Sequence, residues 1–376
     1  MKTPALALEK FRVVICLGPG GVGKTTLSAA LAVSGAASGR AVDVLTVDPA
    51  PRLLDALGLV GDAAEPRDVP LAGVRRPRSA QANRGRLRAL RLDPKRTFDA
   101  IVARHAPSQA ARDAILENRI YRNISNALAG VADYMAMEKL LELAGDRATD
   151  LVVLDTPPAA EALDFLDAPR RLIELLNSRA VTLLSAPAGV LKSGLRVVDL
   201  AARAVLAAFD RVTGLNLLGD VQSFVRSFEG MYAGFAERAR RADAMLRAED
   251  TAVVVVTTAE AARISQANEF VDALGRAGLR VSAGIVNRVM PPLPDVAELE
   301  NAKISAALKR KLTRNLSDYA ALKRREAASL DSLRAALPAG AQLLVASDLG
   351  REPRSLADLM EIAKGLQVRN PAQTDA

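Results

Sequence analysis

A glycine-rich segment near the N-terminus has the residue types and the spacing of a phosphate-binding loop. Residues 18–25 read Gly-Pro-Gly-Gly-Val-Gly-Lys-Thr and match the pattern G-x-x-x-x-G-K-S/T. The apolar run Arg12 to Leu17 precedes this loop, and an Ala-rich helical pattern follows it. Because the motif requires a strand before it and a helix after it, the sequence predicts a site for a nucleotide phosphate here.

Each residue type in the loop has a physical role. Glycines adopt backbone conformations that are closed to other residues and bring N–H groups close to phosphate oxygens, while the helix N-terminus adds the positive end of its dipole. Lys24 is expected to neutralise the β- and γ-phosphates, and Thr25 to offer its hydroxyl to Mg²⁺. The sequence therefore predicts ATP and Mg²⁺ as cofactors, with Lys24 in the catalytic set.

Two aspartates follow apolar runs that read as buried strands. Residues 42–47 lead into Asp48, and residues 151–154 lead into Asp155. Ligands of open α/β sheets bind at the carboxyl ends of strands, so both carboxylates are expected near the phosphates and the metal. Asp48 is interpreted as the residue that positions an attacking water, and Asp155 as a residue of the Mg²⁺ shell. Each could instead only cap the turn that follows it.

The metal and the base have further candidate residues. Thr25, Asp48 and Asp155 together form the predicted Mg²⁺ set, and Thr156-Pro157 is expected to begin a loop that senses the γ-phosphate. Asn287 follows the run RVSAGIV and can pair with the donor and acceptor edge of adenine. Guanine sites typically place an Asp three residues after such an Asn, but that position is Met290 here, which favours ATP over GTP.

Short runs rich in β-branched residues alternate with longer helical patterns along the chain. Runs that are apolar on both faces and separated by helices are typical of a parallel sheet covered on both sides. The sequence therefore predicts an α/β fold, a P-loop NTPase with a mostly parallel central sheet, helices on both faces and an inserted helical subdomain. The expected strands are Arg12–Leu17, Val42–Val47, Leu151–Asp155, Ala180–Ser185, Ala252–Thr257, Arg280–Val286 and Gln342–Ala346.

Two long helical stretches interrupt this alternation. Residues 97–146 and 195–248 are each too long for one crossover helix and are predicted to form a helical subdomain within a single P-loop domain of residues 1–365. An apolar stripe in the second stretch has helical spacing, so it either packs inward or forms a surface for a client. The stripe consists of Val221, Phe224, Phe228, Met231 and Phe235.

The chain ends in polar segments. Lys303 to Arg325 carries many charges on an Ala- and Leu-rich helical pattern and is expected to face solvent, and residues 366–376 are expected to form a flexible tail.

Composition limits the kinds of function. Lys and Arg number 51 against 43 Asp and Glu, so the formal net charge is +8, which permits anionic partners without choosing among them. The densest basic stretch, Arg67 to Arg96, lacks a recognition motif and is interpreted as a solvated loop rather than a nucleic-acid or lipid patch. Aromatic residues make up only 3% of the chain, so the sequence shows no strong signal for nucleic-acid binding.

The few cysteines and histidines exclude several chemistries. Cys16 and His105 are the only residues of their types, so one chain cannot form a disulfide, a thiolate metal site or a Cys-His nucleophile pair. No signal-peptide core and no apolar run approaching the ~20 residues of a membrane-spanning helix are present, so a cytoplasmic location without a transmembrane segment is expected.

The motifs together resemble the arsenical-pump ATPase family, which includes the ATPase that delivers tail-anchored membrane proteins. The resemblance rests on GGVGKTT, VDPA, DTPPAAEALDFL and IVNRV and covers nearly the whole chain; LDPKRTFDAIV, NRIYRNISNALAG and DYMAMEKLLEL are similar to the bacterial branch. It implies a dimer with ATP at the interface, in which hydrolysis moves the two subunits and a helical client-binding subdomain. It also implies the same site: Asp48 for water activation, Asp155 for the second switch, Asn287 for adenine, and for the phosphates Gly20, Gly21, Val22, Gly23, Lys24, Thr25 and Thr26.

The sequence departs from this family in three ways. Members usually carry a lysine as the second loop residue, which reaches the partner's phosphates, but Pro19 stands here and has neither a charge nor a backbone N–H. A homodimer would then hydrolyse ATP slowly, or another residue such as Arg52 would substitute. The lone Cys16 argues against arsenite sensing by three thiolates, and the Cys-x-x-Cys pair that clips some relatives together through zinc is missing.

Three functions remain open from the sequence. The leading reading is a dimerising ATPase that handles a hydrophobic or membrane-associated client. The alternative is a weakly or non-catalytic ATP-binding subunit that pairs with a lysine-bearing paralogue, since Pro19 removes the contribution across the dimer. The third is a partition or positioning ATPase, which the long helical stretches do not favour.

Overall fold

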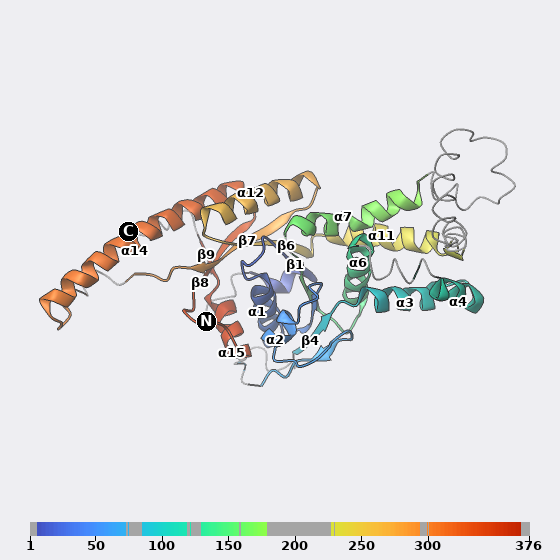
Figure 1. The fold of residues 1–376 in the computed structure, drawn as a ribbon, viewed down its shortest axis with the longest axis horizontal. Helices are drawn as coiled ribbons and strands as arrows, with labels where there is room; N and C mark the ends of the chain where they lie inside the picture. The colour runs from blue at the N-terminus through green and yellow to red at the C-terminus, as the bar shows by residue number, and fades with distance from the viewer. Residues whose placement is uncertain are drawn as a thin grey trace, which may run out of the picture. The chain divides into compact units, whose positions relative to one another are not determined.

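One sheet of nine strands organises the larger part of the chain (Figure 1). The computed structural model describes residues 6–72, 74, 85–118, 121, 129–157, 159–178, 227–228, 230–293, 299 and 301–369. The strand order is β3-β4-β2-β5-β1-β6-β7-β8-β9, and all neighbours are parallel except the edge pairs β3–β4 and β8–β9. The strands are β1 (Val13–Leu17), β2 (Ala41–Thr46), β3 (Arg67–Asp68), β4 (Arg86–Arg91), β5 (Leu151–Asp155), β6 (Thr251–Thr258), β7 (Val281–Val289), β8 (Gln342–Ser347) and β9 (Gln367–Val368).

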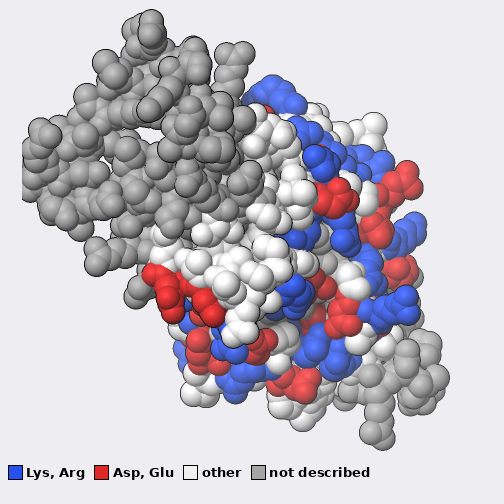
Figure 2. All heavy atoms as spheres, turned by 90° about the vertical axis from the view of Figure 1, so that its right-hand side faces the viewer, with Lys and Arg blue, Asp and Glu red and all other residues white. Residues whose placement is uncertain are grey.

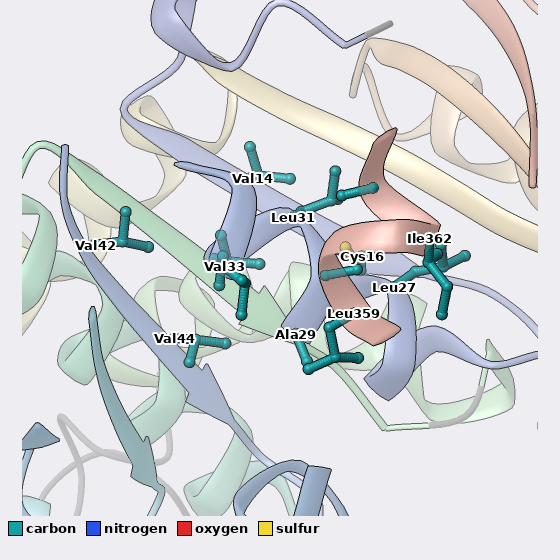
Figure 3. Packing of buried hydrophobic residues seen from close by; sticks show 14 of the residues in the cluster. Val14, Cys16, Leu27, Ala29, Leu31, Val33, Val42, Val44, Leu359 and Ile362 are labelled. Carbon is teal, nitrogen blue, oxygen red and sulfur yellow. The ribbon is translucent and has the colours of Figure 1, made fainter. Parts of the chain in front are cut away.

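Helices cover both faces of this sheet, so the predicted fold class is confirmed. On one face, α1 (Lys24–Ala37) packs against β1 and α15 (Leu356–Gly365), and Figure 3 shows Leu27 and Leu31 among Val14, Cys16 and the α15 side chains. Figure 1 shows α12 (Ala261–Arg276) and α14 (Ala306–Ala336) on the opposite side of the sheet from α1. The apolar runs of the central strands are buried on both faces, as a doubly covered parallel sheet requires.

The expectation of a solvated loop over Arg67–Arg96 is wrong for its second half. Residues 86–91 form β4, which pairs with β2 in a parallel register that places Arg88 beside Asp43. The Arg88 guanidinium donates to both oxygens of the fully buried Asp43 carboxylate, at 2.7 and 2.6 Å. A charged residue can therefore occupy an inner strand because a buried carboxylate neutralises it. Arg75, Arg76, Arg78 and Arg84 of the same stretch lie outside the described residues.

The chain divides into two compact units, and the sheet with its helices belongs to residues 1–91, 143–163 and 247–376. The second unit comprises Leu92–Glu142 and Asp164–Leu246. Its described helices are α3 (Pro94–His105), α4 (Gln109–Glu117), most of α6 (Ala129–Gly145), most of α7 (Ala159–Leu176) and α11 (Tyr232–Leu246). The predicted subdomain boundaries, 97–146 and 195–248, stay a prediction because residues 179–226 lie outside the described part of the chain.

An aromatic core holds the second unit together. Phe228, Met231 and Phe235 are all buried, and the Phe235 ring stacks on Phe228 with centroids 5.2 Å apart. These three residues of the predicted stripe pack inward with Phe98 and Tyr121 rather than forming a client surface. Val221 and Phe224 of the stripe, like the expected strand Ala180–Ser185, lie outside the described residues.

The C-terminal segment begins with a strand. Gln367 and Val368 form β9 and pair with β8, so the expectation of a flexible tail from residue 366 is wrong at these two positions. The described part of the sheet unit also contains α2 (Arg52–Ala56) and a short 3-10 helix, Leu8–Lys10. Among the described residues, no helix combines the length and the apolar character that crossing a lipid bilayer demands.

Candidate nucleotide site

The predicted phosphate loop connects β1 to α1 at the carboxyl edge of the sheet. Gly23 is the N-cap of α1 and has a φ of 93°, in the left-handed region that favours glycine. A Cβ on Gly18 would lie 2.0 Å from the Val256 carbonyl oxygen, and one on Gly23 would lie 2.2 Å from Asn287 Nδ2. Only glycine fits these two positions, so the loop can lie close against the ends of β6 and β7.

Lys24 lies inside this loop. Its side chain is buried, and Nζ donates to the carbonyl oxygens of Gly18 at 3.0 Å and Pro19 at 2.9 Å. Burial lowers the pKa of Lys24, while Asp155 and Asp48 act in the opposite direction. The ammonium is therefore held at the centre of the loop by backbone oxygens and nearby carboxylates, where a phosphate group can meet it.

Asp155 is the centre of a hydroxyl network at the end of β5. The sheet register places it beside Cys16 of β1 and Thr46 of β2. Its Oδ2 accepts hydrogen bonds from Thr25 Oγ1 at 2.9 Å and Thr46 Oγ1 at 3.1 Å, and its Oδ1 accepts one from Ser28 Oγ at 3.3 Å. Two of the predicted metal residues, Thr25 and Asp155, are thus in direct contact.

This donor set fits Mg²⁺. The ion prefers oxygen ligands, keeps several waters and usually takes one or two protein ligands together with substrate phosphates. In the described part of the chain, no group of three or more His, Cys, Asp and Glu could hold a metal by itself. A hydroxyl and a carboxylate beside a phosphate loop therefore suit an ion that the nucleotide also binds.

Asp48 has a different environment. Its Oδ1 accepts a hydrogen bond from the Ala50 backbone N–H at 2.9 Å, and its Oδ2 lies 3.7 Å from Arg52 Nη1. The carboxylate therefore caps the following turn, the alternative that the sequence left open, and its side chain is 24% exposed. The Asp48 carboxylate makes none of the hydrogen bonds described for Asp155. The Asp48 backbone N–H, however, donates to Thr46 Oγ1 at 3.3 Å, so Thr46 links the two predicted metal aspartates although their carboxylates do not share a partner.

Thr156 and Asn287 support the loop from neighbouring strands. Thr156 Oγ1 donates to the Cys16 carbonyl oxygen at 2.8 Å, which joins the start of the segment after β5 to β1. Asn287 is buried, and its Nδ2 donates to the Val22 carbonyl oxygen at 2.9 Å. A carboxamide has a second N–H and an oxygen acceptor, so this contact leaves Asn287 able to pair with a base.

Sequence reasoning missed two polar residues of this site. Ser28 lies one helical turn after Thr25 and so shares its face of α1, and Thr46 is the last residue of β2. The sequence offered two signals for these residues. One was the hydroxyl of Ser28, three residues after Thr25, and the other was the hydroxyl of Thr46, two residues before Asp48. Cys16 is buried beside them, and burial raises the pKa of its thiol to about 12, so it stays protonated and unreactive.

Burial also sets the protonation of Asp155. It raises the pKa of this carboxyl from 3.8 to about 6, although the hydroxyls of Thr25, Thr46 and Ser28 and the charge of Lys24 lower it. Since the folded chain holds this proton more tightly than the unfolded chain, the stabilising effect is complete below pH ~4 and is lost as the pH rises through about 6. The difference between a pKa of 3.8 and one of about 6 corresponds to roughly 3 kcal/mol in the free energy of unfolding.

We therefore expect Asp155→Asn to raise the free energy of unfolding at neutral pH by up to about 3 kcal/mol when nucleotide and magnesium are absent. The measurement is urea unfolding of the wild type and the variant at about pH 5 and at about pH 8. The increase in the free energy of unfolding should be larger at pH 8. Asp318→Asn, on the exposed face of α14, is the control and should change neither value. An unaltered pH dependence in Asp155→Asn would contradict the assignment.

Comparisons with known proteins identify the family of this chain. The family model described as anion-transporting ATPase matches residues 11–321. An uncharacterised protein of Streptomyces coelicolor is 28% identical over 283 residues, which cover 74% of this chain and 63% of the relative. The ATPase get3 of Neurospora crassa is 27% identical over 187 residues, which cover half of each chain. A Mycobacterium tuberculosis protein is 32% identical over 176 residues, which cover 44% of this chain and 38% of the relative. The chain thus spans less than two thirds of the length of each of these relatives.

Proposed function

The chain belongs to the anion-transporting ATPase family, and from this premise we propose that it is a Mg²⁺-dependent ATPase that works as a dimerising switch for a hydrophobic or membrane-associated client. The observation that carries the proposal is the contact of Thr25 and Asp155 beside the buried Lys24, at the carboxyl edge of a parallel sheet. This is the place where open α/β sheets bind their ligands.

Each side chain has a role in this proposal. The N–H groups of residues 20–26 and the Lys24 ammonium hold the phosphates, and Thr25 with Asp155 holds Mg²⁺. The bound ion would neutralise charge on the transferring phosphoryl group. Asp48 would position the attacking water once its carboxylate is released from the turn that it caps, and Asn287 would pair with adenine while still supporting Val22.

The client part of the proposal rests on the family resemblance. Three members of the apolar stripe are buried in the aromatic core of the second unit, so they offer no exposed groove. The dimer likewise follows from the resemblance. Both proposals are tested on the complete chain by mass measurement with and without ATP, and by capture of short apolar C-terminal helices in the presence of ATP.

Turnover separates the ATPase from the alternative of a non-catalytic ATP-binding subunit. Calorimetry should detect binding of Mg·ATP, and phosphate release should accompany it. Retention of ATP without phosphate release would select the non-catalytic subunit, and the absence of both would refute the proposed site.

Pro19 gives the alternative a specific test. If the loop lacks a cation that acts across a dimer, Pro19→Lys should raise the ATPase rate of the chain alone by roughly 10²-fold, the lower end of what one preorganised donor contributes. Pro338→Lys adds the same charge to an exposed turn and should leave the rate unchanged. A fast wild-type enzyme that Pro19→Lys does not affect would end the hypothesis of a lysine-bearing partner, and would leave Arg52, whose side chain is 74% exposed, as the substitute cation.

A further inference from the structure

The first half of α14 extends beyond the body of the sheet unit. The residues of α14 that are buried, Leu330 and Leu333, lie in the last third of the helix, where Gly284 of β7 is close to Leu333. Two hydrogen bonds join the middle of α14 to the segment after β7. Lys323 Nζ donates to the Pro291 carbonyl oxygen at 3.1 Å, and Glu326 accepts from the Met290 N–H at 3.0 Å. Figure 1 shows the preceding turns of α14, in orange, leading away from the strands. We refer to residues 306–322 as the α14 arm.

The arm has an apolar stripe at helical spacing. Its members follow one another at intervals of four, four, three and three residues, which places them on one face of the helix. Leu308 is 44%, Tyr319 51% and Leu322 49% exposed, whereas Leu330 and Leu333 on the continuation of that face are fully buried. Leu312 and Leu316 are partly buried, so the described residues cover this face of the arm only in part. The stripe is Leu308, Leu312, Leu316, Tyr319 and Leu322.

Basic side chains surround this stripe. Between Ala306 and Arg325 the only acidic residue is Asp318. By contrast, the face drawn in Figure 2 mixes basic and acidic side chains, so charge there has no single sign. The predominance of basic residues in this part of α14 therefore differs from the mixed charge of that face. The basic residues between these positions are Lys309, Arg310, Lys311, Arg314, Lys323, Arg324 and Arg325.

We propose that the α14 arm docks on an anionic lipid surface, lying in the headgroup region with its apolar stripe toward the acyl chains. An amphipathic helix with Lys and Arg on its polar face binds there through buried apolar area and attraction to anionic lipids. The stripe accounts for the apolar part, and the four basic residues of the arm, with Arg324 and Arg325 at its base, account for the attraction. This inference is independent of ATP hydrolysis, since no residue of the nucleotide site takes part.

Charge also argues against two other occupants. A second copy of the arm would bring two cationic segments together, and like charges on facing helices oppose association. A nucleic acid would neutralise the basic residues but would leave Leu308, Tyr319 and Leu322 without an apolar partner. A lipid surface is the partner that satisfies both the stripe and the charge.

A fluorescent reporter can test the docking directly. The chain contains no Trp, so Tyr319→Trp introduces a single indole on the stripe. We expect its emission to shift to shorter wavelength with vesicles of phosphatidylcholine and phosphatidylglycerol, and not with phosphatidylcholine alone. Val60→Trp, at an 88% exposed position away from α14, is the matched reporter and should not shift. No shift of Tyr319→Trp with anionic vesicles, or an equal shift with neutral ones, would overturn the proposal.

Charge and stripe variants separate the two contributions. Arg310→Gln with Arg314→Gln should weaken vesicle binding by about thirtyfold, which corresponds to about 1 kcal/mol for each cationic residue near an anionic surface. Arg276→Gln with Arg280→Gln removes the same charge from another exposed part of the unit and should have little effect. Leu308→Ser with Leu322→Ser should abolish sedimentation with vesicles while leaving thermal unfolding unchanged.

Three results would contradict lipid docking. Equal losses in both arginine pairs would mean that only net charge matters. Self-association of the wild-type chain that Leu308→Ser with Leu322→Ser abolishes, with no vesicle binding, would assign the stripe to a second copy. Binding to a DNA duplex that depends on Arg310 and Arg314 but not on the leucines, again without vesicle binding, would assign the basic residues to nucleic acid.

Discussion

Replacing Lys24 by Ala should lower the ATPase rate by roughly 10²- to 10³-fold, the effect of removing one preorganised donor that stabilises developing charge. The Lys24 ammonium is buried within the loop, and its hydrogen bonds to Gly18 and Pro19 hold it where phosphate oxygens would replace those carbonyls. The variant should also bind Mg·ATP more weakly, because the lost charge acts on the bound phosphates as well as on the transition state. Steady-state phosphate release and calorimetry measure these two effects separately.

The same substitution should not unfold the protein. Burial lowers the pKa of Lys24, which means that its charge is held against a cost of desolvation. We therefore expect the free energy of unfolding of Lys24→Ala to stay within about 1 kcal/mol of the wild type in the absence of nucleotide. Lys364→Ala, at an exposed position of α15, is the control for lysine removal and should change neither rate nor binding. A Lys24→Ala protein that is folded and hydrolyses ATP at the wild-type rate would refute the phosphate loop.

The sequence could predict the loop and the strands beside it because each has a local signature. β5 begins and ends at the expected residues, Leu151 and Asp155, since a β-branched run followed by Asp-Thr-Pro-Pro marks both its interior and its end. What the sequence could not provide is the order of the strands. The contact of Asp155 with Thr25 and Thr46 depends on β5 lying between β1 and β2, which is a property of the whole sheet.

Asn287 illustrates how a residue type can be compatible with two roles. Its position after a strand suggested a base-pairing amide, but the structure shows that one N–H supports the Val22 carbonyl. That contact requires Gly23, because a side chain there would overlap Asn287 Nδ2. Neither requirement is visible in the spacing of two segments that lie 265 residues apart.

The strand β4 was missed because its sequence, RLRALR, was judged by the charges of its own residues. An arginine on an inner strand depends on a partner from another strand, and Arg88 has Asp43. The Asp43 carboxylate also accepts a hydrogen bond from Thr149 Oγ1 at 2.8 Å, so a third segment completes the pair. Asp43 therefore accounts both for the failed expectation and for the stability of this side of the sheet.

Removing that carboxylate should have a large effect on stability. Asp43→Ala would remove the carboxylate that both pairs with the Arg88 guanidinium and accepts from Thr149. Arg88, whose side chain is 19% exposed, would keep only the Asp146 carboxylate at 3.7 Å and the Thr149 hydroxyl at 3.3 Å. Removing one partner of a buried ion pair costs about 3–5 kcal/mol, and the partly exposed Asp146 offsets some of this cost, so we expect the free energy of unfolding to fall by up to that amount. Urea unfolding followed by circular dichroism provides the measurement. A loss below about 1 kcal/mol would show that Asp146 and solvent together replace Asp43 as the partner of Arg88.

A second ion pair on the same strand supplies the matched control. Arg91 Nη2 lies 2.8 Å from Asp62 Oδ1, but these side chains are 31% and 60% exposed, so Asp62→Ala should cost only about 0–1 kcal/mol.

Changing both members of the buried pair, Asp43→Leu with Arg88→Leu, should recover most of the stability that Asp43→Ala loses, because two apolar side chains leave no charge to solvate. If the double variant were as unstable as Asp43→Ala, the cost would come from packing around β2 and β4 rather than from the loss of the Arg88 ion pair with Asp43. The three variants together therefore determine whether neutralisation by Asp43 is what allows an arginine-rich segment to form an inner strand next to the nucleotide site.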